Sequence, residues 1–445
     1  MFQVGFSKQD LEHALRPVLP VREERIEAIA LYLKSETLRS IWITLDFMDF
    51  DLHVVSTLTD AVQEATGIHR EHIHIVTTHN HGGGEPDLNI LADLTVQCAQ
   101  NAMLCAVPAQ MRWCRCKADR QLNLIRRYPV PELGGVNTLY YGATEETGFD
   151  SAPFAEYAID SVKNGRLRYS GQAETSRPVA PLPPGDDMVI AVQFCDPAGN
   201  TVGTIVRFAA HAVCCNLDDS YSSDYPYHVR KAVEQTFGGI GLFWNGPCGD
   251  IAPAMGDKTD GTQVKLGNHI AQLAANALKN ASYSPIHTFR DTSVPIPLPV
   301  RSEVQTNTVC LPAAVPDALP ARRKHLEKQL LTELMDFLQK KYRNGEKQPA
   351  ETITVSLGLL TLNDLTFTAF PGETFFATGQ ALQEAFPKQH ICTVTEHGRT
   401  VMYLPPQEEC ELGGYESVCR TTAAHAESIL RSCAQTAAAE FMEYS

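Results

Sequence analysis

The chain has 445 residues, 44% hydrophobic and 20% charged, which predicts one large or two ordinary globular domains and excludes a disordered or fibrous protein. The formal net charge of -15 argues against a nucleic-acid partner, because such a surface cannot replace phosphate counterions. We expect no membrane span, since no window approaches 18 uninterrupted apolar residues, and the N-terminus shows no signal-peptide pattern. The thirteen cysteines have no disulfide-framework spacing, which favours reduced thiols and a cytoplasmic location.

The first hundred residues predict alternating helices and strands. Helical patterns cover 7–18 and 22–36, and prolines separate them. A strand over 41–45, a helix over 52–66 and a strand over 73–77 follow, and this order favours an α/β arrangement with at least one parallel pair. A further apolar helix is predicted at 90–106.

The middle of the chain begins with a long stretch of weak periodicity. Residues 130–187 are rich in Gly, Pro, Ser and acidic residues, and we interpret them as surface loops around a short helix, lying over the site. Two strands at 188–194 and 201–208 are then joined by a hairpin turn, and a short buried strand follows at 239–244. The next predicted element is a helix at 264–280.

The last part of the chain predicts its longest helix, over 316–343, with one leucine-rich face. That face fits both packing on the chain's own core and an oligomer contact, and the core is the simpler interpretation. Strands at 356–360 and 365–370 and a C-terminal helix at 421–441 complete the pattern. We find no internal repeat and no domain boundary, so residues 1–445 are interpreted as a single domain.

Polar clusters stand at the ends of four predicted strands. His79 and His81 follow the first, His211 the second, Asn245 to Pro253 the third, and Glu373 the fourth. Loops at strand ends of α/β folds converge on one crevice, so we expect these residues to meet. Two histidines and a glutamate suit a hydrolytic zinc with a position left for water. The same ligands suit a ferrous centre, and residue types and spacing alone leave both metals open.

Five short motifs in this order resemble those of the neutral ceramidases and of the broader bacterial family built on their catalytic domain. The resemblance runs from Val4 to about Glu416, and the family's C-terminal immunoglobulin-like domain is not expected here. It implies an α/β or α+β fold in which mixed sheets are flanked by helices and the metal site lies at strand ends. The motifs are Thr78-His79-Asn80-His81, Phe208-Ala209-Ala210-His211, Gly249-Asp250-Ile251-Ala252-Pro253, Pro371-Gly372-Glu373, and Tyr403-Leu404-Pro405-Pro406 with Gly413-Gly414-Tyr415-Glu416.

The resemblance also implies roles for individual residues. One zinc ion would be held by His79, His211, Glu373 and Tyr403. His81 would hold or polarise the substrate carbonyl or a catalytic hydroxyl. Arg126, or Arg127 in its place, would orient the amide oxygen or a substrate hydroxyl. Asp250 and Tyr415 are further catalytic candidates. Asp224 would support the ligands from behind.

One position departs from the family pattern. The ceramidases carry a serine where this chain has Ala252, and that serine is counted among their catalytic groups. Water activated by zinc can attack without it, so we expect a zinc-dependent hydrolase of an N-acyl amide, either ceramide-like or another small acylated amine. The alternatives are a catalytically impaired relative that binds a ligand, and a non-haem iron enzyme that uses the same ligands.

Overall fold

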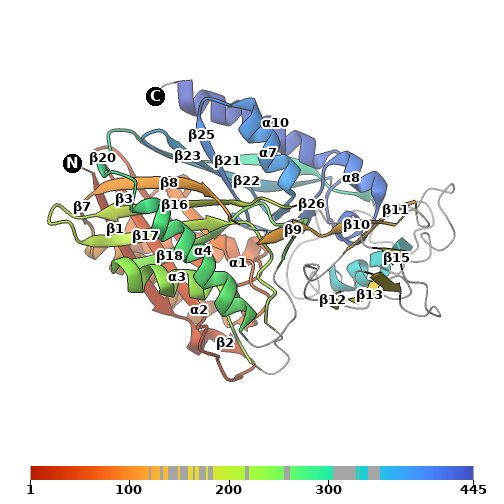
Figure 1. Ribbon diagram of the computed structural model, residues 1–445. Helices are drawn as coiled ribbons and strands as arrows, with labels where there is room; N and C mark the ends of the chain where they lie inside the picture. Colours follow the sequence, from red (N-terminus) through yellow and green to blue (C-terminus); the bar gives the residue numbers. More distant parts are fainter. Residues whose placement is uncertain are drawn as a thin grey trace.

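The computed structural model describes residues 2–119, 122–130, 134–138, 149–150, 159–163, 166–169, 177–178, 184–215, 220–254, 261–302, 304, 327–328, 330–338 and 351–443. Three mixed sheets form its framework, and Figure 1 shows helices on their outer sides. The predicted fold class is confirmed. Among the described helices, none combines the length and apolar character needed to cross a membrane.

The first sheet comes from the N-terminal hundred residues and has the strand order β5-β4-β3-β1-β7. Only β4 and β5 are parallel, and the helix between them, α1, packs with α2 on the outer face of the sheet. The bounds are β1 (Gln3–Asp10), β3 (Glu27–Lys34), β4 (Arg39–Leu45), α1 (Leu52–Thr66), β5 (Ile73–Thr77), α2 (Leu88–Leu104) and β7 (Val107–Pro108).

The helices predicted at 7–18 and 22–36 are wrong. These segments contain β1, the short 3-10 helix η1 (Glu12–Ala14) and β3, and β1 and β3 pair antiparallel. The apolar run of β3 is covered on both faces: Ala28 and Tyr32 lie in the cluster under the helices, and Leu31 lies in the cluster between the sheets. A strand buried on both sides loses its alternation, so its pattern cannot be told from that of a buried helix.

The second sheet has the order β18-β17-β16-β8-β20, with β17 and β18 parallel, and α3 and α4 pack together on its outer face. The strands predicted around residues 190, 205 and 242 are confirmed. The bounds are β8 (Gln110–Lys117), β16 (Met188–Cys195), β17 (Thr201–Phe208), α3 (Asp224–Phe237), β18 (Ile240–Asn245), α4 (Thr262–Leu278) and β20 (Ser284–Pro285).

The third sheet has the order β21-β22-β23-β25, with β23 and β25 parallel. Of the helix predicted at 316–343, the structure describes 327–328 and 330–338, which are helical, and the rest lies outside the described residues. Leu330, Leu331 and Leu334 pack in this sheet's outer core, which supports the core interpretation. The bounds are β21 (Phe289–Pro299), β22 (Thr352–Leu362), β23 (Leu365–Ala369), α7 (Phe376–Ala385), β25 (His390–Val394) and α10 (Ala426–Glu443).

The C-terminal helix α10 starts later than predicted. Thr422 forms a β-bridge with Val300, and the Thr421 hydroxyl donates to the carbonyl of Val401, so this segment is held in extended backbone before the helix begins. Two short helices precede it, α8 (Gln407–Leu412) and α9 (Tyr415–Val418).

The three sheets repeat one order of elements that the sequence analysis did not find. In each, three antiparallel strands are followed by a helix, a parallel strand and a second helix, giving β1-β3-β4-α1-β5-α2, β8-β16-β17-α3-β18-α4 and β21-β22-β23-α7-β25-α10. The inner faces share one hydrophobic core in which Trp42, Trp244 and Phe367, one from each sheet, lie close together. The ends of the parallel strands therefore open toward a common region.

Short strands complete the molecule, and those from β10 onward to β15 lie at one end of it in Figure 1. Within 130–187, where we expected loops around a short helix, most of the described residues form such strands, and the remainder lies outside the described residues. The bounds are β2 (Leu15–Arg16), β6 (Glu85–Pro86), β9 (Asn123–Ile125), β10 (Arg127–Val130), β11 (Gly135–Thr138), β12 (Phe149–Asp150), β13 (Ile159–Lys163), β14 (Arg166–Tyr169), β15 (Arg177–Pro178), β19 (Ile251–Pro253), β24 (Glu373–Thr374) and β26 (Tyr403–Leu404).

Candidate metal centre

Three predicted ligands meet where strands of the three sheets end. His79 follows β5, His211 follows β17, and Glu373 lies beyond β23 at the start of β24. Glu373 Oε2 lies 3.3 Å from His79 Nε2 and 3.0 Å from His211 Nε2. All three side chains are buried. The structure therefore brings these three side chains together.

The opposite ring nitrogens fix the orientation of both imidazoles. His79 Nδ1 lies 3.0 Å from the carbonyl oxygen of Met48, and His211 Nδ1 lies 3.0 Å from that of Ile251. A carbonyl only accepts, so each Nδ1 carries a hydrogen and each ring turns its Nε2 toward Glu373, where that nitrogen can bind a cation once it carries no proton. This is the arrangement in which backbone carbonyls commonly orient metal-binding histidines.

The negative charges around this cluster favour the binding of a positive charge. His79 Nε2 is buried and has no hydrogen-bond partner, and it faces a carboxylate oxygen and the second imidazole. Although burial opposes it, the carboxylates of Glu396 and Glu373 raise the pKa of His79 to about 9. The field that attracts a proton here also attracts a divalent cation. The described residues therefore fit the zinc ion that the resemblance implies.

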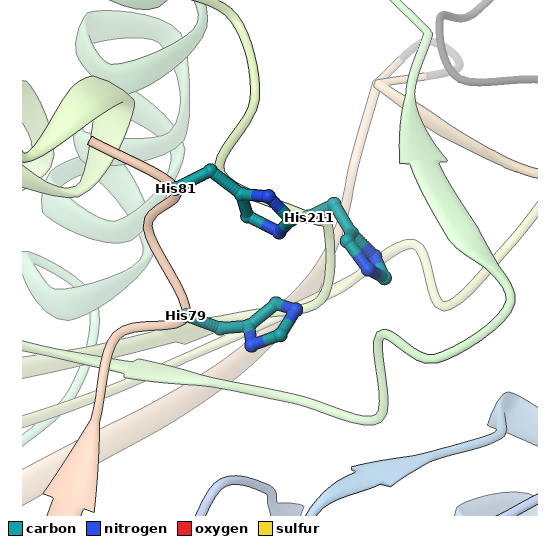
Figure 2. A group of neighbouring side chains, drawn as sticks. All are labelled: His79, His81 and His211. Atoms are coloured by element: carbon teal, nitrogen blue, oxygen red, sulfur yellow. The ribbon is translucent and has the colours of Figure 1, made fainter. Parts of the chain in front are cut away.

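His81 stands beside the other two histidines but is exposed to solvent. Figure 2 shows His79 and His81 on one loop, with His211 next to them. The ring of His81 is centred 5.1 Å from that of His79 and 5.8 Å from that of His211. The surrounding protein and these two neighbours lower the pKa of His81 well below its usual value, although solvent reaches the ring. A neutral imidazole thus lines the open side of the centre.

Tyr403 is brought to the centre by a short parallel pairing of β24 with β26, in which Glu373 and Tyr403 are direct partners. Its ring is stacked near that of His211, with centroids 6.4 Å apart. Its hydroxyl accepts a hydrogen bond of 2.9 Å from Arg126. Burial raises the pKa of the phenol well above its usual value, and the Arg126 guanidinium opposes that shift.

Arg126 is part of a buried ionic network and not a solvated residue. Its guanidinium donates to Glu416 Oε1 at 2.8 Å, to the carbonyl of Gly249 and to Tyr403. The neighbouring Arg127 donates to the other oxygen of Glu416 at 2.9 Å, and Thr138 donates to the same oxygen. The structure therefore places Arg126 behind Tyr403, where it holds the phenol in position.

Asp250 and Ala252 follow β18, Asp250 just before β19 and Ala252 within it. Asp250 Oδ1 accepts from the backbone N–H of Phe376 at 2.8 Å, so this carboxylate caps the N-terminus of α7. Burial raises the pKa of Asp250 to about 6. Ala252 is completely buried and lies opposite Leu124 in the pairing of β19 with β9. Gly249 is required here, because a Cβ would lie 2.4 Å from the carbonyl oxygen of Glu373.

The two remaining predicted residues lie at the margins. Tyr415 packs edge-on against Tyr403, with ring centroids 5.5 Å apart. Asp224 is buried and accepts from the backbone N–H groups of Cys215 and Tyr225, so it fastens the loop that follows His211. Burial raises its pKa.

Residues near the centre were also missed. Glu396 follows β25, and one of its oxygens lies 3.6 Å from His79 Nδ1. Burial and the negative charge of Glu373 raise the pKa of Glu396 to about 8, although His79 lowers it. The strand-end rule that selected His79 applies equally to the run Thr395-Glu396-His397, and would have found it. The carbonyls of Met48 and Ile251 leave no signal in a sequence, because every residue has one.

Comparisons with known proteins identify the fold. No protein-family model and no curated protein matches the chain. A crystal structure of neutral ceramidase from Pseudomonas aeruginosa superposes with a TM-score of 0.65 and 14% identity, covering 98% of this chain and 73% of that one. A ceramidase complexed with C2 superposes with a TM-score of 0.68 and 14% identity, covering 100% and 75%. The predicted resemblance is therefore confirmed at the level of the fold.

Proposed function

We propose that this chain, which shares its fold with the neutral ceramidases, is a zinc-dependent hydrolase of N-acyl amides. The observation that carries the proposal is the convergence of His79, His211 and Glu373 from three sheets, with two oriented Nε2 atoms facing one carboxylate oxygen. Such a set binds a divalent cation and leaves room for water. With Tyr403 beside Glu373, four side chains are available as ligands.

The chemistry divides between the ion and the side chains. A bound zinc would supply Lewis-acid polarisation of the amide carbonyl and of a water molecule. Neutral His81, exposed beside the ligands, takes a proton from the water that attacks the carbonyl carbon. The C–N bond then breaks, and His81 returns the proton to the leaving amine. Arg126 keeps the Tyr403 phenol in place. The products are a carboxylate and a free amine.

The substrate class follows from the chemistry and from the named neighbours. Both superposed proteins are described as ceramidases, which supports an N-acylated amine with a lipid-like acyl chain. An N-acyl amino sugar or another small acylated amine uses the same reaction.

We place the protein in the cytoplasm, and the twelve free thiols in the described part of the chain support a reducing compartment.

One observation favours a second candidate. The position that carries a catalytic serine in the ceramidases is the fully buried Ala252. A relative that has lost its chemistry would keep the cluster of polar side chains and bind a ligand without cleaving it. A ferrous enzyme with the same ligands is the third candidate.

One experiment separates these candidates. The protein is purified without chelator, its metal content is measured, and a panel of fluorescent N-acyl amides is screened with the native, chelated and zinc-restored forms. We expect one zinc per chain and restorable hydrolysis. His79→Ala should lose the metal and at least about a hundredfold of the rate. His269→Ala, the same change at a histidine on α4 that pairs with Asp119, is the matched control.

The other outcomes are equally definite. Iron in place of zinc would support an oxygenase. Zinc retained without turnover of any amide would support the ligand-binding relative. Full activity in His79→Ala would contradict a metal-dependent mechanism at this centre.

A further inference from the structure

A buried hydrogen-bonded triad of two histidines and an aspartate lies behind the metal centre and takes no part in the proposed reaction. His74 Nδ1 lies 3.0 Å from His397 Nε2, and His74 Nε2 lies 3.0 Å from Asp291 Oδ2. At the far end, His397 Nδ1 lies 3.0 Å from the carbonyl oxygen of Ser356. All three side chains are buried, and each comes from a different part of the fold.

A count of the N–H groups that the contacts of this triad require shows that it needs one proton more than two neutral imidazoles carry. The carbonyl of Ser356 and the carboxylate of Asp291 only accept, so the outer contacts each require an N–H. The contact between the two rings requires one more. Three N–H groups on two imidazoles exceed by one the number that two neutral rings carry. The pair of His74 and His397 therefore holds one proton more than two neutral rings, and the charge of Asp291 balances it.

The packing around the pair is specific for two rings. The indole of Trp42 stacks on His74 with centroids 3.9 Å apart, and its N–H donates to Asp291 Oδ1. Gly358 lies beneath the pair, where a Cβ would come within 3.0 Å of His397 and 3.2 Å of His74. The interactions with His74 and His72 lower the pKa of Asp291 to about 2 against the effect of burial, while burial and His74 lower that of His397 to about 3. The lowered pKa of Asp291 agrees with a charged aspartate beside His74.

The pair also lies at a joint between two ligand-bearing segments. Residues 396–398 donate and accept backbone bonds on both sides. His397 N–H donates to Phe370, just before Glu373, and Gly398 N–H donates to Ile75 of β5. The Thr77 N–H, just before His79, donates to the carbonyl of Glu396. This segment thus connects the strand that leads to His79 with the strand that leads to Glu373.

We propose that His74, His397 and Asp291 form a proton-dependent clamp that fixes the spacing of His79 and Glu373. The three are positioning residues, acting through the backbone of 396–398, and their effect on metal binding rests on the proposed function. When the pair loses its proton, one of the three contacts loses its hydrogen and brings two acceptors together. The clamp then weakens, and the two ligand-bearing strands are held less firmly.

A cavity and neighbouring charged groups lie on one side of this cluster. His397 and Ser356 line a cavity of about 660 Å³ between α1, β5 and β22. The other titratable group on the carboxylate is His72, whose Nδ1 lies 3.1 Å from Asp291 Oδ2 and whose Nε2 lies 3.4 Å from Glu71. The bond to Asp291 raises the pKa of His72. A test of the clamp must therefore remove the titration of His72.

The test compares His72→Gln with the double variant His72→Gln/Asp291→Asn, both metal-free, in urea unfolding between pH 7 and 9. The folded clamp binds one proton that the unfolded chain does not, so its stability falls as the pH rises. We expect the unfolding constant of the single variant to increase up to about tenfold more per pH unit than that of the double variant. The asparagine side chain can donate to His74 Nε2, which satisfies every contact with neutral rings. If the unfolding constants of the two variants change equally with pH, the clamp proposal is overturned.

Two further measurements guard against a variant that fails to fold. Side-chain 15N spectra of the wild type at pH 7.5 should show a ring with both nitrogens protonated, and neutral rings throughout would overturn the proposal. Gly358→Ala should weaken zinc affinity by about tenfold or more, whereas Ser293→Ala, its cross-strand neighbour, should leave it unchanged. Equal affinities overturn the positioning role. The unfolding curves use the metal-free protein, so they judge the clamp whether or not zinc binds.

Discussion

At the scale of single residues, unusual backbone conformations gather around the metal centre. Of the five non-glycine residues with positive φ in the described part of the chain, four lie there: His79, Asp224, Glu396 and Met402. The left-handed region costs such residues free energy and persists only where surrounding contacts impose it. His79 is held by Met48, and Met402 directly precedes Tyr403. The chain thus accepts local strain where it aims its ligands.

Ala252 provides a test of whether the missing serine limits the chemistry. Because Ala252 is completely buried, Ala252→Ser adds a hydroxyl to a packed site, and we expect a loss of about 1–3 kcal/mol in stability with no gain in kcat/KM. Ala254→Ser, also fully buried, is the control and should behave alike. A large rate increase confined to Ala252→Ser would argue that a serine nucleophile, and not water, is the group that matters.

Glu24 contributes to the loss of folding stability at low pH. Although burial opposes it, hydrogen bonds from His228 and Gln263 lower the pKa of Glu24 from 4.5 to about 2. A carboxyl whose folded pKa is depressed stabilises the protein above its unfolded pKa and loses that contribution as the pH falls. Glu24→Gln should therefore flatten the decline in unfolding free energy between pH 4.5 and 2. The exposed Glu23→Gln should not, and an unchanged acid limb in Glu24→Gln would refute this assignment.

At the scale of elements, the helix between the parallel strands of the first sheet starts at a defined cap. The Asp51 side chain accepts from the backbone N–H of Val54 at 2.9 Å, and α1 then leads into β5 and His79. We expect Asp51→Ala to cost about 1 kcal/mol in urea unfolding, the usual loss for an N-cap. Asp60→Ala, in the same helix, breaks only an exposed pair with Arg70 of the following 3-10 helix and should cost less. Equal losses would mean that the cap contributes nothing.

At the scale of the whole molecule, the proposed metal ligands come from the strand ends of three sheets. A zinc ion bound by His79, His211 and Glu373 stabilises only the folded state, since the unfolded chain does not bring them together. Zinc at a hundredfold excess over its Kd should raise the unfolding free energy by about 2.7 kcal/mol, seen as a higher Tm in thermal scans. His79→Ala should show no such increase. A zinc-induced shift of the same size in that variant would place the ion elsewhere.

Much of the candidate site was predictable from sequence because its signals are local. A strand pattern that ends in His79, His211 or Glu373 needs only neighbouring residues to be recognised, and so does the helix at 52–66. The fourth proposed ligand, Tyr403, came from motif resemblance, since nothing in its own surroundings marks it. Local patterns failed in β1 and β3, whose identity depends on what covers them.

The sequence by itself determined which residues can bind a metal and that they stand at strand ends, because residue type and short-range periodicity are encoded locally. Only the tertiary structure decided how they meet. The repeated order of three sheets, the pairing of Glu373 with Tyr403, and the contact of His74 with His397 join residues far apart in the chain. Such contacts depend on which surfaces bury one another, and no short window of sequence contains that information.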